Sequence, residues 1–177
     1  MTTRRTRPSY EESCRELQRL GWLKPGSIPP LPTRRPRYDD PEPLGVEFFR
    51  TRVSDDKFEN LTLPRTFFGR SEIRDTSFGG TDLSESTLCW NDFIAVDFSD
   101  CDLSNSDLRA ALFEKVNFSG ANLSQADLRR SEFQNCDFSG ATLRGAKLTR
   151  SQRLALSPSQ EQEVDWQRSD GDEPGGG

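Results

Sequence analysis

The sequence predicts an all-β solenoid: a parallel β-helix of about five stacked coils, with short helical or extended capping segments at both ends. The leading observation is a period of five, because every fifth residue from position 58 to position 148 is Phe, Leu or Ile. This spacing fits neither a helix nor a flat strand, so the chain must turn a corner after each short apolar step. The nineteen positions are Phe58, Leu63, Phe68, Ile73, Phe78, Leu83, Leu88, Phe93, Phe98, Leu103, Leu108, Phe113, Phe118, Leu123, Leu128, Phe133, Phe138, Leu143 and Leu148.

A second series of residues lies two positions before each apolar centre. From position 66 to position 146 its members are small or β-branched, except for Asn91. Each five-residue unit therefore has one large and one small inward position and three outward positions, an alternation typical of a strand that lasts a single step. The larger side chain of Asn91 at a small inward position predicts a local bulge.

Residues twenty apart match more closely than residues five apart, which indicates that four units make one coil. Phe recurs at positions 58, 78, 98, 118 and 138, and Leu recurs at positions 63, 83, 103, 123 and 143. Identical side chains that stack on one another form columns that pack without gaps. At about 4.8 Å per stacked strand, five coils form a column on the order of 25 Å tall.

Two consecutive units read Ala-Asn-Leu-Ser-Gln at 121–125 and Ala-Asp-Leu-Arg-Arg at 126–130. In these units the chain resembles the pentapeptide-repeat family, whose motif is A(D/N)LXX. The resemblance covers residues 66–150 well and residues 46–65 weakly, where Asp56 and Leu61 occupy the small position. It implies a right-handed quadrilateral parallel β-helix with four sides per coil. The twenty-residue columns independently agree with four sides.

Residues 1–45 are expected to cap the first coil. Residues 9–12 (Ser-Tyr-Glu-Glu) have the spacing of a capping box and predict a helix to about Leu20, which Gly21 ends. Seven prolines between residues 25 and 43 favour an extended segment. It is interpreted either as a stiff arm along the β-helix or as a ligand for an aromatic groove of the SH3 type. The apolar residues within and beside it favour the arm.

Residues 46–150 are expected to form the repeat body. Residues 151–166 are expected to cap its last coil. Ser157 and Pro158 have the character of an N-cap and a first helical residue, and they predict a short helix to about Trp166. Residues 167–177 are acidic and rich in glycine, a composition that predicts disorder.

Composition argues against several classes of function. Only 32% of the 177 residues are hydrophobic and 30% are charged, which suits the thin core of a solenoid better than a compact globule. The chain has no histidine, so the usual general base and the commonest metal ligand are missing. We therefore expect no enzyme activity and no catalytic, cofactor-binding or metal site.

Charge and cysteine usage bear on partners and compartment. Residues 46–150 carry thirteen Lys or Arg against seventeen Asp or Glu, and this acidic body disfavours direct nucleic-acid binding. No apolar run is long enough to span a membrane, and no secretory signal is recognised. The four scattered cysteines then indicate reduced thiols and a cytoplasmic protein. They are Cys14, Cys89, Cys101 and Cys136.

Two surface features are candidates for binding a protein partner. Column arithmetic places several apolar residues outward at one corner, where a partner or the N-terminal arm could cover them. It also places a ridge of arginines on one side of the coil, while other sides are acidic, and such segregation can steer a charged partner. The candidate partner-binding residues are Trp90, Ile94, Leu112, Cys89, Arg109, Arg129 and Arg130.

These features predict a non-enzymatic protein–protein interaction module, for which a bacterial immunity or antitoxin-like role is a special case. One alternative comes from the family resemblance, since some members imitate duplex DNA, bind DNA gyrase and give quinolone resistance. Such members are long, evenly acidic rods that dimerise through a C-terminal helix, and this chain departs from that pattern with its basic ridge and shorter body. A second alternative is a structural scaffold with no dedicated ligand. The sequence does not identify the partner or the oligomeric state.

Overall fold

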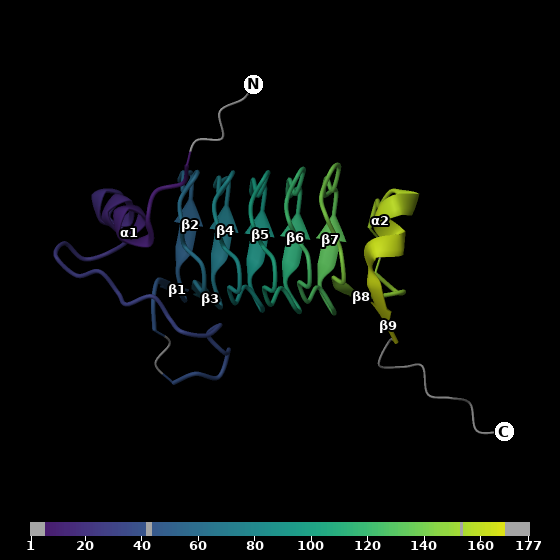
Figure 1. Cartoon of the computed structure of the whole chain (residues 1–177), viewed down its shortest axis with the longest axis horizontal. Coiled ribbons are helices and arrows are strands. Elements are labelled where there is room, and N and C mark those ends of the chain that lie inside the picture. Colours follow the sequence, from purple (N-terminus) through teal and green to yellow (C-terminus); the bar gives the residue numbers. More distant parts are fainter. Residues whose placement is uncertain (1–5, 42–43, 153, 169–177) are drawn as a thin grey trace.

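The computed structural model describes residues 6–41, 44–152 and 154–168. Short strands stand in a row along the long axis of the molecule, with one helix at each end (Figure 1). In chain order the elements are α1 (Tyr10–Arg19), β1 (Glu47–Phe49), β2 (Arg52–Ser54), β3 (Phe67–Gly69), β4 (Glu72–Arg74), β5 (Asp92–Ile94), β6 (Leu112–Glu114), β7 (Glu132–Gln134), β8 (Lys147–Thr149), α2 (Pro158–Glu163) and β9 (Asp165–Gln167).

The strands form a parallel β-solenoid whose register is twenty residues. Strands β2, β4, β5, β6 and β7 make one parallel sheet, in which Phe93 of β5 pairs with Ile73 of β4 and Phe113 of β6. Single parallel bridges repeat the same offset on the other sides, such as Ser77 to Asp97. Each coil thus contributes to four ladders, as a four-sided coil requires. The predicted parallel solenoid is confirmed, while its right hand stays a prediction.

The solenoid continues further than the five predicted coils. Strand β9 pairs in parallel with β8, with Trp166 opposite Leu148, and this pair adds a partial coil beyond the last repeat. The structure therefore has about six turns, with little helix.

The core is a pair of aromatic columns flanked by leucines. Rings in the first column stack at centroid distances of 5.1 to 5.6 Å from Phe58 to Phe118 and 5.0 Å from Phe118 to Phe138. Rings in the second column, Phe93, Phe113 and Phe133, stack at 5.2 Å. Neighbouring columns meet edge to face, which is the other favoured geometry of aromatic pairs.

Hydroxyl groups at the small inward positions satisfy the backbone at the corners. The amide of Leu61 donates to Thr81 Oγ1 at 3.0 Å, and Ser106 Oγ donates to the carbonyl of Leu83 at 3.0 Å. Asn91 takes the same role, since its Oδ1 accepts from the Ser71 amide at 2.8 Å and its Nδ2 donates to the Phe68 carbonyl at 3.0 Å. The bulge predicted at Asn91 is wrong, because β4, β5 and β6 pair there without a register break.

Helix α1 caps the first coil, and the predicted capping box is present between Ser9 and Glu12. Cys14 and Leu17 are fully buried in the core cluster. Ser13 Oγ accepts from the amide of Thr62 at 2.8 Å, which ties the helix to the coil it covers. The helix thus supplies both apolar cover and hydrogen-bond acceptors to the exposed end of the solenoid.

The proline-rich segment lies along the coils. Pro32 and Pro36 are buried, and their carbonyls accept hydrogen bonds from Arg65 and Thr87 of the solenoid. Further along, Arg35 Nη1 donates to the carbonyl of Asn105 at 2.8 Å. These contacts agree with the arm interpretation of the described part of the segment.

The C-terminal cap differs from its prediction. Helix α2 begins at the expected Ser157 capping box but ends at Glu163, and Trp166 lies in strand β9. The reason is that the last coil still offers donors: the amide of Gly145 donates to the Glu163 carbonyl at 2.8 Å. Pairing with that coil competes with further helix. Of the predicted disordered tail, Gln167 belongs to β9 and residues 169–177 lie outside the described residues.

We expect Phe98→Ala to lower the free energy of unfolding by about 3–5 kcal/mol, because Phe98 is fully buried in the middle of its column. Urea denaturation followed by circular dichroism measures the change. Phe49→Ala is the matched control, since Phe49 is 44% exposed and should lose less than half as much. Equal losses in the two variants would contradict the stacked core.

Candidate protein-binding surface at the Trp90 corner

One corner of the solenoid carries a column of arginines interrupted by a tryptophan. Adjacent coils are about 4.8 Å apart, so residues twenty apart on a corner are near neighbours. Arg70 is therefore the neighbour of Trp90 in the preceding coil, and Arg130 lies two coils after Trp90. The column consists of Arg50, Arg70, Trp90, Ala110, Arg130 and Arg150.

Trp90 projects from a strained corner and stays largely open. Its backbone φ is 60°, in the left-handed region that costs a bulky residue energy, and 57% of its surface is exposed. Tyr38 of the arm packs beside it at a ring-centroid distance of 6.4 Å, and the Tyr38 hydroxyl accepts from Arg70 Nε at 2.8 Å. The arm thus borders Trp90 on one side without covering it.

Trp90 stands between two hollows. The larger has a volume of about 780 Å³ and is lined in part by Arg109, Arg129 and Arg130. The smaller has a volume of about 570 Å³, and its lining includes Arg50, Arg52, Arg70 and Tyr38. A partner that reaches Trp90 therefore meets arginines on both sides.

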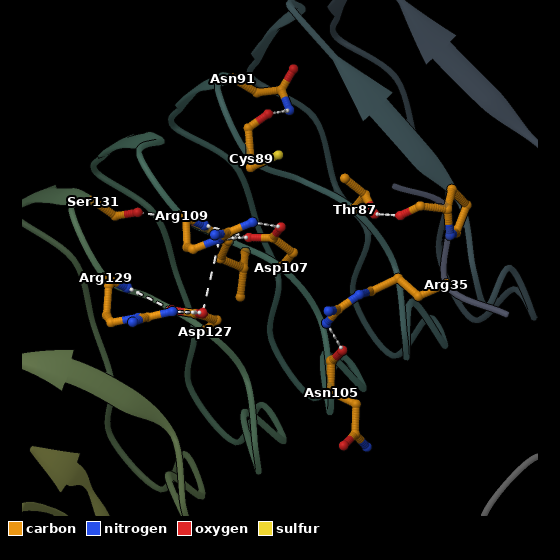
Figure 2. A network of polar contacts seen from close by, with 12 residues as sticks. Arg35, Thr87, Cys89, Asn91, Asn105, Asp107, Arg109, Asp127, Arg129 and Ser131 are labelled. Carbon is orange, nitrogen blue, oxygen red and sulfur yellow. Dashed lines mark hydrogen bonds and ion pairs between the residues drawn. The ribbon is translucent and has the colours of Figure 1, made fainter. Parts of the chain in front are cut away.

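Two of these arginines are held in place by carboxylates, of which Asp107 is buried and Asp127 is half-buried (Figure 2). Arg109 donates to both oxygens of Asp107, with Nε–Oδ1 at 2.8 Å and Nη2–Oδ2 at 2.7 Å. Arg129 binds Asp127 in the same fork, at 2.9 and 2.7 Å. Bidentate pairs of this kind fix the guanidinium planes before any partner arrives.

The pKa values of the pairs reflect this arrangement. Burial by itself would raise the pKa of Asp127, but hydrogen bonds from Arg129 and the charges of Arg129 and Arg109 lower it below its ordinary value. Hydrogen bonding to Asp107 raises the pKa of Arg109, so this guanidinium is always charged. The ridge is thus an ordered array of ion pairs with outward-facing cationic edges.

The predicted apolar patch is only partly present. Cys89 is 1% exposed, so it adds no open apolar surface, although it lines the larger hollow. Burial together with the charge of Asp107 raises the pKa of Cys89 to about 12. Ile94 and Leu112 are partly buried, and neither lines the larger hollow. Trp90 is therefore the aromatic element of the surface, with arginines rather than aliphatic residues around it.

Sequence reasoning missed several residues of this surface. Tyr38 and Arg168 line the larger hollow, although they lie far from Trp90 in the sequence. Arg50 and Arg52 line the smaller hollow, and extending the twenty-residue column back from Trp90 would have found Arg50. No periodic signal marks Tyr38 or Arg168.

Within residues 6–41, 44–152 and 154–168, no three His, Cys, Asp or Glu side chains are grouped so that they could hold a metal ion. Neither described helix has the length and apolar character needed to cross a membrane.

Comparison with known proteins agrees with the repeat geometry. The family model for pentapeptide repeats matches eight copies, in segments 71–109, 92–130 and 111–150. A pentapeptide-repeat protein from the thylakoid lumen of Arabidopsis thaliana is 30% identical, with 62% of this chain and 71% of that chain covered and a TM-score of 0.44. The chain belongs to the pentapeptide-repeat family.

Two further solved structures are less similar to this chain in sequence. Rfr23 from the cyanobacterium Cyanothece 51142 is 14% identical, covering 54% of this chain and 82% of that chain with a TM-score of 0.46. QnrB1, a plasmid-mediated fluoroquinolone resistance protein, is 15% identical, covering 71% of this chain and 92% of that chain with a TM-score of 0.25. Among curated proteins no match was found.

We expect Asp127→Asn to make the stability of the fold less sensitive to acid. Because the folded-state pKa of Asp127 is lowered, its contribution is present above the ordinary value of 3.8 and is lost as pH falls through the folded-state value. Urea titrations between about pH 6 and about pH 2 should give a shallower loss in the variant, which starts about 1–3 kcal/mol less stable at neutral pH.

Arg129→Gln is the second variant in this test, since it removes the main partner of Asp127. Like Asp127→Asn, this variant should lose less of its free energy of unfolding as the pH falls. Parallel pH curves for wild type and both variants would contradict the assigned role of the ion pairs.

Proposed function

We propose that this pentapeptide-repeat protein is a non-enzymatic binding module that takes an acidic surface of a partner protein at the Trp90 corner. The observation that carries the proposal is a tryptophan that is 57% exposed, stands at a strained corner and has arginine-lined hollows on both sides. Tryptophan and arginine dominate the residues that contribute most to protein–protein binding energy.

The surface is suited to binding because several of its side chains are held in fixed positions before a partner docks. Arg109 and Arg129 are held by bidentate bonds to Asp107 and Asp127, so little side-chain entropy would be lost when a partner docks. The Trp90 ring rotates about only two side-chain bonds and offers a large apolar area at low entropic cost. The solenoid beneath it is a rigid stack of aromatic rings.

The partner is expected to be acidic where it meets the corner. Four of the six residues in the corner column are arginines, although the whole chain carries a net charge of −5. Such local separation of charge steers a complementary surface toward the corner and repels basic ones. An immunity or antitoxin-like role, in which the partner is a toxin, is one form of this proposal.

Two alternatives have less support. A mimic of duplex DNA acting on gyrase would present an acidic surface, whereas the exposed corner column is basic. A scaffold with no ligand would have no use for a tryptophan that is 57% exposed.

A cytoplasmic location is part of the proposal. All four cysteines are thiols, and three of them, Cys14, Cys89 and Cys101, are buried. Unpaired cysteines are typical of reducing compartments.

Affinity capture from an extract of the source organism, followed by binding measurements with the purified partner, tests the proposal. Trp90→Ala should weaken binding at least tenfold, as expected for a central aromatic contact. Arg130→Glu should also weaken it and reduce its dependence on salt, because a favourable charge is reversed.

Arg144→Glu is the matched control, because the same charge reversal there affects an exposed residue away from the corner column. It should change the affinity by less than about twofold. Urea denaturation checks that each variant keeps its fold. Equal binding by wild type and Trp90→Ala would contradict the proposal, as would inhibition of gyrase supercoiling or turnover lost on replacing one acidic residue.

A further inference from the structure

The main parallel sheet has an open edge at its C-terminal end. Each of strands β4, β5 and β6 pairs with a strand on both sides, whereas within residues 6–41, 44–152 and 154–168 β7 pairs with β6 alone. The amides of Ala95 and Lys115 donate to the next coil at 2.8 Å, to Glu114 and Gln134 respectively. Asn135 is the equivalent residue one coil later, and its amide has no acceptor among the described residues.

The chain seals the corners on both sides of this edge. Gln152 Nε2 donates to the carbonyls of Leu128 and Ser131 at 2.7 and 2.9 Å. Gln160 Nε2 donates to the carbonyls of Phe138 and Ala141 at 2.7 and 2.9 Å. The two glutamines replace bonds that a further coil would have made. Gln152 takes the Ser131 carbonyl, which is equivalent to the Ala111 carbonyl that accepts from the Glu132 amide in the preceding coil, so an added strand has to displace this side chain there, while the Asn135 amide stays available.

The inward position of this sheet is apolar in every described coil. It holds Val53, Ile73, Phe93, Phe113 and Phe133 in succession.

Phe133 is consequently the end of an unfinished stack. Phe93 and Phe113 are fully buried, whereas Phe133 is partly exposed. It lines a hollow of about 840 Å³ whose other apolar walls include Cys136, Leu154 and Trp166. A ring placed above Phe133 at the 5.2 Å spacing of the stack would restore the burial that the earlier coils have.

We propose that β7 accepts an extended segment of a partner protein as an added parallel strand, with a central Phe or Leu over Phe133 and a Lys or Arg directly before it. Edge strands bind peptides in this way, through backbone hydrogen bonds for affinity and alternate side chains for specificity.

The preference for Lys or Arg in the partner segment follows from the charge on β7. Glu132 of β7 is exposed and precedes Phe133, so a parallel strand would place its first residue above this carboxylate. The same sheet already contains such a pair, because Arg52 of β2 lies opposite Glu72 of β4 with Nε–Oε1 at 3.9 Å. A three-residue strand of basic, apolar and polar residues thus repeats the pattern of β2, which reads Arg-Val-Ser.

The test is a nuclear magnetic resonance titration of the ¹⁵N-labelled full chain with the blocked pentapeptide Thr-Lys-Phe-Thr-Gly. The Asn135 amide should shift, and its hydrogen exchange should slow by at least about tenfold at saturation, because a free N–H becomes bonded. A peptide with glutamate in place of lysine should bind several-fold more weakly. A peptide with methylated backbone nitrogens should bind at least about tenfold more weakly.

Glu132→Lys separates this docking mode from nonspecific contact. The exposed side chain can be changed without disturbing the core, and the variant should prefer the glutamate peptide over the lysine peptide. Trp90→Ala should leave peptide affinity within twofold, so failure here and failure at the Trp90 corner are distinguishable. Three results would overturn the proposal: no shift at millimolar peptide, equal binding of the methylated peptide, or Asn135 protection that rises with protein concentration alone, which would assign the edge to a second copy.

Discussion

The twenty-residue register is the constraint on which the rest of the structure depends. From β1 to β7 every coil has the same length, so parallel hydrogen bonds continue from coil to coil and each coil brings a ring or a large apolar side chain to the same place. Ring distances of 5.0 to 5.6 Å along the Phe58 to Phe138 column show that the rings stack in this register. The side chains at the small positions must then satisfy the corners, and Thr81, Asn91 and Ser106 do so with different polar groups.

The same register arranges the surface. A residue on a corner has neighbours twenty positions away, so four arginines twenty or more positions apart line up along one corner, with Trp90 between them. The Asp107 and Asp127 ladder is built by the same rule, and it holds Arg109 and Arg129 in bidentate pairs. Order in the core thereby also orders the side chains of this surface.

Where the register ends, the chain replaces missing backbone partners with side chains. Helix α1 offers Ser13 to the first coil, and Gln152, Gln160 and Glu163 serve the last one. These replacements are local, because a side-chain amide can satisfy two carbonyls at a corner but cannot imitate a whole strand. The edge of β7 is the place where local replacement is incomplete, and this incompleteness makes it a candidate for strand addition.

The sequence by itself determined the solenoid, its aromatic and leucine columns, the capping helix near Tyr10 and the basic ridge, because all of these depend on periodic spacing or on local capping patterns. Only the tertiary structure decided that Tyr38 borders Trp90 and that Arg168 reaches the same hollow, since long-range docking of an arm leaves no periodic trace. It also decided that Cys89 is buried at its outward position and that Trp166 forms a strand rather than the end of a helix. In these two cases the environment of the residue is set by a neighbouring coil. The position of a residue in the repeat does not reveal which side chains bury it, or which unpaired amide of the next coil binds its backbone.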